Sequence, residues 1–148
     1  DRLSSIPYPK ALRVLLQPLP RTRAAAQDAA VSFFRAVGST GFPFDEEGVR
    51  QRAGQQYDRG PSPRGFMRQM TAVLAADDRR PALRTLRLPS LVVHGTIDPL
   101  IPRRGGVQTS RALPRARLLE IPGMGHDLPR DAWGTILDAF ESVTRAQA

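Results

Sequence analysis

Near residue 88 the pattern of this sequence changes from helical to strand-like. A short apolar run at 89–94, ended by Gly95, is typical of a strand buried on both faces of a parallel sheet. A helical stretch from about Gly105 to Leu113 follows, and then a second strand at 116–121. Strand, helix and strand in this order form a βαβ unit, whose strands are parallel. We therefore expect an α/β fold.

The first 87 residues carry helical patterns only. Prolines at 7, 9, 18 and 20 leave room for one short helix at about 10–17. A longer amphipathic helix is expected from Thr22, as N-cap, to Gly38. Further helices are expected at 45–57 with Asp45 as N-cap, around an apolar face of Phe66, Met70, Val73 and Leu74, and at 81–86.

A last helix is expected from about Arg130. Its apolar residues fall on one side, at Trp133, Ile136, Leu137, Phe140 and Val143. This stripe is interpreted as core packing.

Two loops follow the predicted strands at their carboxyl ends, where open α/β sheets place their ligands. The first contains Asp98, and Pro99 after it favours an extended backbone that presents the carboxylate from a stiff turn. The second is Gly123-Met-Gly-His126, in which the glycines permit tight turns that aim the imidazole back over the sheet. We expect the Asp98 carboxylate to lie within hydrogen-bonding range of the His126 ring.

The run LVVHGTIDPLIP at 91–102, followed by EIPGMGH at 120–126, resembles the end of an α/β-hydrolase. In that family an acid follows one late strand and a histidine follows the next. The resemblance implies that Asp98 is the acid and His126 the general base of a Ser-His-Asp triad. It also implies two parts: a helical lid or cap with a connector at 1–87, and the C-terminal β-α-β-α part of the core at 88–148. The stretch YDRG at 57–60 is similar to a bacterial group of lipase- and esterase-like hydrolases.

The serine nucleophile of such a triad is missing from this sequence. No G-x-S-x-G elbow occurs, and the nearest imitation, around Ser62, is flanked by two prolines and interpreted as a turn. The chain also begins at Asp1 without an initiator methionine, so we expect a processed or truncated form that lacks the nucleophile, the oxyanion hole and the central strands. Such a chain is expected to be inactive alone.

Other residues near these motifs have plainer interpretations. His94 is expected to be a hydrogen-bonded structural residue, and Asp127 a helix cap or loop anchor rather than a second triad acid. Aromatic and methionine side chains could line an acyl pocket or pack between helices, two alternatives that the sequence leaves open: Phe42, Phe44, Tyr57, Met67 and Met70.

The charge of +8, with 22 Lys and Arg against 14 Asp and Glu, raises the alternative of nucleic-acid binding. Basic residues are scattered along the chain, however, and no helix-turn-helix or zinc spacing accompanies them, so no nucleic-acid partner is expected. The absence of cysteine excludes thiolate metal sites and a cysteine nucleophile. Without a run of about 18 apolar residues or a signal-peptide pattern, we expect a cytoplasmic protein without a membrane span.

The resemblance to α/β-hydrolases implies a serine hydrolase that acts on an ester or similar acyl bond of a small molecule, without cofactor or metal. The alternatives are a hydrolase with an aspartate nucleophile, of the dehalogenase or epoxide hydrolase type, and a non-catalytic binding protein on the same fold. Two strands offer little sheet for a stable core, so marginal stability or self-association of the chain on its own is also expected.

Overall fold

The computed structural model describes residues 6–145 of the chain. The helical half comprises α1 (Pro9–Leu15), α2 (Arg23–Val37), α3 (Glu46–Asp58), α4 (Pro63–Ala75) and α5 (Arg80–Leu83). The second half comprises β1 (Ser90–Gly95), α6 (Arg103–Ala112), β2 (Ala116–Ile121), a 3₁₀ turn at Arg130–Ala132 and α7 (Trp133–Arg145). The expected order of elements is therefore confirmed, with boundaries within a few residues of the predicted ones.

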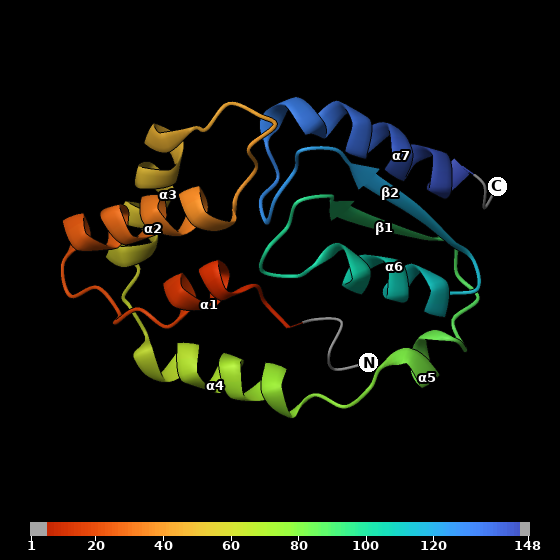
Figure 1. The fold of residues 1–148 in the computed structure, drawn as a ribbon, viewed down its shortest axis with the longest axis horizontal. Helices are drawn as coiled ribbons and strands as arrows, with labels where there is room; N and C mark the ends of the chain where they lie inside the picture. Colours follow the sequence, from red (N-terminus) through yellow and green to blue (C-terminus); the bar gives the residue numbers. More distant parts are fainter. Residues whose placement is uncertain (1–5, 146–148) are drawn as a thin grey trace.

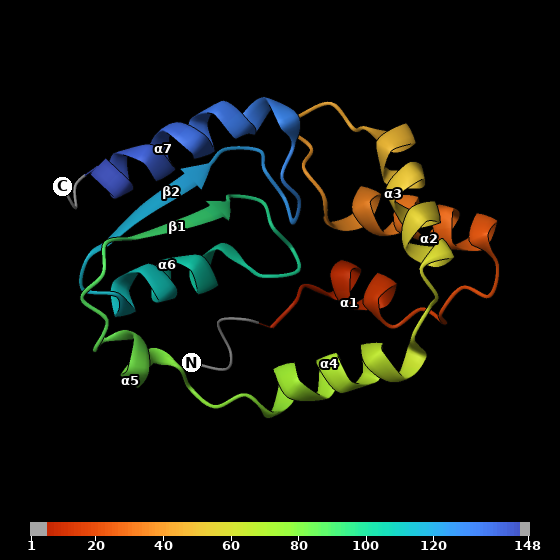
Figure 2. The same cartoon turned by 180° about the vertical axis from the view of Figure 1, so that it is seen from behind.

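The two strands form a parallel sheet whose carboxyl ends face the helical half. Ser90 pairs with Ala116, and the register continues to Gly95 opposite Ile121. Helix α6 covers one face of the sheet and α7 the other, while α1, α2 and α3 lie beyond the arrowheads of the strands (Figures 1 and 2). The α/β class is thus confirmed, and both predicted loops emerge at the edge that faces the helices.

Side-chain caps set the start of three helices. Thr22 accepts a hydrogen bond from the Ala25 amide at the start of α2, and Asp45 accepts one from the Gly48 amide at the start of α3. Ser62 does the same for α4. These bonds satisfy amides that have no partner within their own helix. Both caps predicted from the sequence are confirmed.

The buried core of the second half is small. It consists of Ile121, Met124 and Ala132, with Phe42, Val93, Leu119 and Ile136 packed against it. Strand β1, expected to be buried on both faces, is mostly half-buried. Within residues 6–145 it pairs with β2 alone, which leaves its other edge without a strand.

The interpretation of the stripe on α7 as core packing is wrong for three of its five residues. Trp133, Leu137 and Phe140 are about half exposed, at 49%, 59% and 57%. The reason is geometric, because a sheet of two strands is too narrow to cover the whole apolar side of the helix. The apolar face expected on α4 is likewise uncovered, since α4 has no buried residue.

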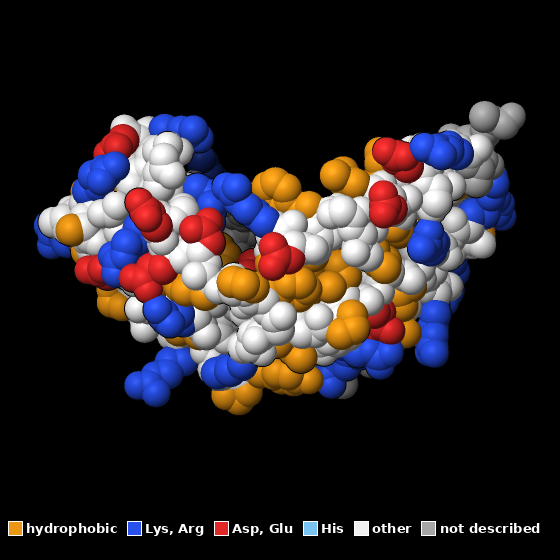
Figure 3. Space-filling model, turned by 90° about the horizontal axis from the view of Figure 1, so that it is seen from above, with side chains coloured by type: hydrophobic (Ala, Val, Ile, Leu, Met, Phe, Trp, Pro, Cys, Tyr) orange, Lys and Arg blue, Asp and Glu red, His pale blue; other side chains and the backbone are white. Residues whose placement is uncertain are grey.

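The uncovered side of α7 borders a groove along β1. The groove has a volume of about 600 Å³ and is lined mainly by apolar side chains, namely Pro89, Leu91, Val93, Ile136, Leu137, Phe140, Val143 and Thr144. In the view from above, apolar side chains gather over the middle of the molecule while charged ones lie mostly toward its two ends (Figure 3).

No helix within residues 6–145 combines the length and apolar character needed to cross a bilayer.

Candidate active site

Asp98 lies in the turn that follows β1 and is held there by backbone amides. Its Oδ1 atom accepts hydrogen bonds from the amides of Leu100 (2.8 Å) and Ile101 (2.9 Å). The side chain is 6% exposed, and Pro99 beside it is fully buried. The carboxylate is therefore fixed by its own turn, as the Asp-Pro pair predicts.

His126 lies in the loop that follows β2, and this loop is tied to the Asp98 turn. The Ile97 amide donates to the Met124 carbonyl oxygen (3.1 Å), and the Gly123 amide donates to Thr96 Oγ1 (3.1 Å). Gly123 has a φ of 73°, a conformation that side chains with a Cβ rarely adopt. The two loops therefore behave as one unit at the carboxyl ends of the strands.

The expected contact between the acid and the histidine is present. His126 Nδ1 lies 2.8 Å from Asp98 Oδ2. Because an ionised carboxylate can only accept a hydrogen bond, the hydrogen of a neutral ring belongs on Nδ1. The lone pair of Nε2 is then the one that can accept a proton.

The electrostatics of the pair favour its charged form. The hydrogen bond that the ring donates to Asp98 raises the pKa of His126 above its usual value, against a smaller opposing effect of burial, and the charges of Asp98 and Asp127 add to the rise. Burial alone would raise the pKa of Asp98, but the hydrogen bonds from His126 and from the Ile101 and Leu100 amides outweigh it, and this pKa is lowered. His126 is therefore a stronger base than a free imidazole.

The other residues singled out in the sequence lie outside this pair. His94 hydrogen-bonds through Nε2 to the Ile101 carbonyl oxygen (2.9 Å) and packs on Gly106, which confirms a structural residue. Ser62 caps α4 with its hydroxyl. Asp127 does not bond to the His126 ring and instead accepts hydrogen bonds from Ser39.

The aromatic residues considered for an acyl pocket occupy separate places. Phe42 packs on the small core beside β2, and Phe44 lies under the Arg35 guanidinium at 4.8 Å from the ring centre. The Tyr57 hydroxyl donates to the Arg21 carbonyl oxygen. Met67 is 60% exposed. Of the two alternatives, local packing accounts for Phe42, Phe44 and Tyr57.

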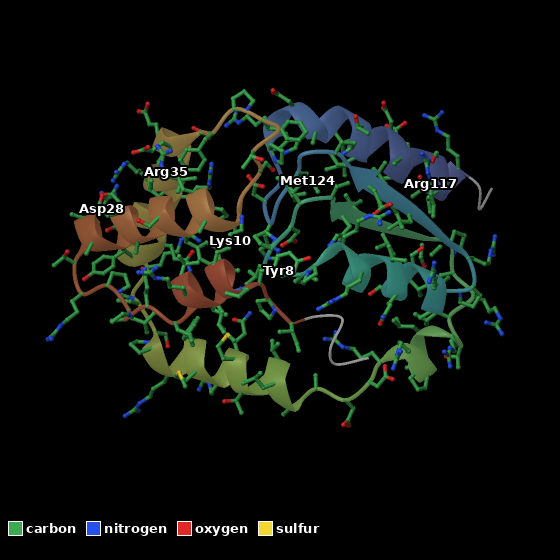
Figure 4. All side chains as sticks on the ribbon, viewed as in Figure 1. Tyr8, Lys10, Asp28, Arg35, Arg117 and Met124 are labelled. Atoms are coloured by element: carbon green, nitrogen blue, oxygen red, sulfur yellow. The ribbon has the colours of Figure 1, made fainter. Side chains whose placement is uncertain are left out.

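One part of the site was not foreseen from the sequence. The segment 37–41, which begins at the last residue of α2, lies against the His126 loop, and the amide of His126 donates to the Val37 carbonyl oxygen (2.7 Å). Figure 4 shows Met124, from the His126 loop, and Tyr8 near the centre of the molecule, between Asp28 and Arg35 at one end and Arg117 at the other. The glycines at 38 and 41 were the only signal, since close backbone approach requires glycine.

A model of the alpha/beta hydrolase fold matches residues 8–130 of this chain. The chain belongs to the alpha/beta hydrolase fold family. The position of Asp98 and His126 after successive parallel strands of an α/β-hydrolase fold agrees with the resemblance drawn from the sequence.

Solved structures with this fold include an esterase from Rhodococcus, RhEst1. It is 19% identical, has a TM-score of 0.67, and is matched over 97% of this chain and 51% of its own. A mutant of the meta-cleavage product hydrolase CumD from Pseudomonas fluorescens is 15% identical, with a TM-score of 0.61 over 98% of this chain and 54% of its own. The putative non-heme bromoperoxidase BpoC from Mycobacterium tuberculosis is 23% identical, with a TM-score of 0.53 over 84% and 54%.

At these identities the similarity concerns the fold. The chain spans about half the length of each of these three structures.

Proposed function

We propose that this chain supplies the acid and the general base of a serine hydrolase that cleaves an ester or similar acyl bond. The observation that carries the proposal is the 2.8 Å contact between His126 Nδ1 and a buried carboxylate that two amides already hold in place. A histidine in a surface loop is not usually hydrogen-bonded to a buried carboxylate. In a triad, the partner fixes the tautomer of the base and stabilises the imidazolium that forms.

The chemistry follows from the lone pair of Nε2. His126 takes the proton of a serine hydroxyl as its oxygen forms a bond to the acyl carbon, and Asp98 stabilises the positive ring. The ring then gives this proton to the departing alcohol oxygen as the ester bond breaks, which leaves an acyl-enzyme. Water repeats the sequence through the same nitrogen and releases the acid and the free serine.

The nucleophile is assigned to a part of the hydrolase that these 148 residues do not include. Ser62 is engaged as a helix cap, and Ser39 Oγ is bonded to Asp127 (2.5 Å) and to the Gly125 amide (3.0 Å). The bare edge of β1 and the apolar side of α7 are surfaces on which further strands of an α/β-hydrolase sheet would pack. The span of about half of the matched structures supports the same assignment.

The two halves of the chain take different roles in this proposal. Residues 1–87 form a helical lid or cap with its connector, and residues 88–148 form the end of the catalytic core. The support is that the strands direct their carboxyl ends, with Asp98 and His126, toward the helices (Figure 1). An ester of a small molecule is the proposed substrate class, and the esterase from Rhodococcus with the same fold supports it.

The test uses the complete gene product that contains these residues. Its hydrolysis of p-nitrophenyl esters is measured for the wild type and for Asp98→Asn and His126→Gln, with Asp131→Asn as control because Asp131 is exposed and lies outside the pair. We expect kcat to fall by about a thousandfold to ten-thousandfold in both site variants, with little change of KM. The control keeps its wild-type rate.

Three results would overturn the proposal. Ester hydrolysis at the wild-type rate in His126→Gln would show that His126 is not the general base. Turnover of haloalkanes or epoxides, with no ester hydrolysis, would assign an aspartate nucleophile instead. Saturable binding of small esters with no turnover would assign a binding protein.

A further inference from the structure

The segment 37–41 and the His126 loop are joined by a ladder of hydrogen bonds. The Ser39 amide and hydroxyl both donate to Asp127 Oδ1, at 2.8 and 2.5 Å. The same hydroxyl accepts from the Gly125 amide at 3.0 Å. The Gly41 amide donates to the Gly123 carbonyl oxygen at 3.0 Å. Ser39 is thus the centre of a network that joins residues 86 to 88 positions apart in the sequence.

The fit between the two segments leaves no free space. A Cβ on Gly125 would collide with the backbone of Gly38, and one on Gly41 would lie 2.7 Å from the Cα of Gly123. The His126 loop therefore has one arrangement against the segment 37–41, and the bonds of Ser39 and Asp127 select it.

We propose that Ser39 and Asp127 are positioning residues for the base, and that they hold the His126 ring in register with Asp98 from the helical half of the molecule. The inference rests on the proposed function, because it concerns the base of that reaction. His126 is held by hydrogen bonds to both halves of the chain. Its ring is hydrogen-bonded to Asp98 and its amide to the Val37 carbonyl oxygen. Its two neighbours in the chain, Gly125 and Asp127, are hydrogen-bonded to Ser39.

Asp127 acts on the base in two separable ways. Its Oδ1 atom anchors Ser39, and its charge adds to the rise of the pKa of His126. Among the described residues, Asp98 and Asp127 are the titratable groups that act on this ring. Asp127→Asn keeps an oxygen that can accept from Ser39 but removes the charge, whereas Asp127→Ala removes both.

The first measurement is made on the complete gene product that contains these residues and does not depend on its activity. Amide hydrogen exchange of His126 and Gly125, and the pKa of the His126 ring, are followed by NMR. Ser39→Ala and Asp127→Ala should speed exchange of both amides by about tenfold or more, which corresponds to the loss of a hydrogen bond. Asp127→Asn should lower the pKa of the ring with a much smaller effect on exchange. Ser39→Thr keeps the hydroxyl and should therefore retain slow exchange of both amides.

The matched controls are Ser32→Ala, on an exposed position of α2, and Asp131→Asn, in the exposed turn before α7. Both should leave exchange and the ring pKa unchanged. Unchanged exchange and an unchanged Nδ1 hydrogen bond in Ser39→Ala and Asp127→Ala would overturn the inference. A global loss of protection in these variants, beyond the amides of the loop, would overturn it as well by assigning a purely structural role.

The second measurement separates this inference from the proposed function. In the complete gene product, Ser39→Ala and Asp127→Ala should lower kcat for ester hydrolysis and leave KM nearly unchanged, and Asp127→Asn should shift the pH profile of kcat/KM toward lower pH. Absence of esterase activity in the wild type would refute the proposed function and leave the NMR result standing. Wild-type activity with unaltered kcat in the alanine variants would refute the positioning role alone.

Discussion

Asp98→Asn tests how the carboxylate controls the His126 ring. An asparagine has nearly the same shape, and its oxygen can still accept from the Leu100 and Ile101 amides, which lie 2.8 and 2.9 Å from Oδ1 of the aspartate. Its NH₂ group then replaces Oδ2 and can only donate. The ring must accept this bond at Nδ1, so its hydrogen moves to Nε2, and the atom that takes the serine proton is lost.

The cost to stability follows from the same three contacts. The variant keeps two amide bonds and the ring bond, but none of them involves a charge. Charged hydrogen bonds contribute about 1.5–3 kcal/mol and neutral ones about 0.5–1.5 kcal/mol. The His126 side chain is 35% exposed, which weakens the charged bond, so we expect a loss of about 1 kcal/mol in the free energy of unfolding. Asp98→Ala also strands both amides and should cost about 2 kcal/mol more.

Two assays on the 148-residue chain measure these effects. Nitrogen-15 NMR of the imidazole, at a pH where the ring is neutral, reports which nitrogen carries the hydrogen, and urea unfolding reports the stability. The wild type should have its hydrogen on Nδ1, and Asp98→Asn should have it on Nε2. A ring that keeps its hydrogen on Nδ1 in Asp98→Asn would refute the argument, because the carboxylate would then not be what fixes the tautomer.

Three further predictions concern the fold. The pKa of His126 is raised, so the contribution of this group to stability is lost as the pH rises through that pKa. The pKa of Asp98 is lowered, so its contribution is lost at low pH. The stability difference between wild type and Asp98→Asn should therefore be largest between about pH 4 and 6.5 in urea titrations. Gly125→Ala should destabilise the chain by about 1–3 kcal/mol through its clash with the segment 37–41, whereas Gly134→Ala, which meets nothing within 4 Å, should not destabilise it. Replacement of Leu137 and Phe140 by Ser should reduce any self-association of the 148-residue chain measured by sedimentation. Unchanged association would show that another surface is responsible.

The elements that sequence patterns predicted best are those fixed by neighbouring residues. Thr22 and Asp45 cap their helices because each side chain reaches an amide three positions on. The contact between Asp98 and His126 could be predicted because the carboxyl ends of parallel strands lie at the same end of a sheet. The position of His94 also followed from its place at the end of a strand.

Features that depend on distant or unseen partners could not be predicted. The apolar stripe of α7 has the spacing of a core helix, but its burial depends on how much sheet lies beneath it, and periodicity does not reveal that. The contact of Ser39 with Asp127 joins residues 88 positions apart, and neither residue belongs to a pattern. The glycines at 38 and 41 permit close backbone approach, but they do not identify the partner segment.

Site-mapped labelling with a fluorophosphonate probe tests the central claim most directly. The 148-residue chain and the complete gene product are treated side by side, and the modified residue is located by mass spectrometry. We expect no label on the 148-residue chain, and one labelled serine in the complete product that lies outside these residues and loses its reactivity in His126→Gln. A label on Ser39, Ser62 or any other serine of this chain, or a labelled serine that does not depend on His126, would contradict the account.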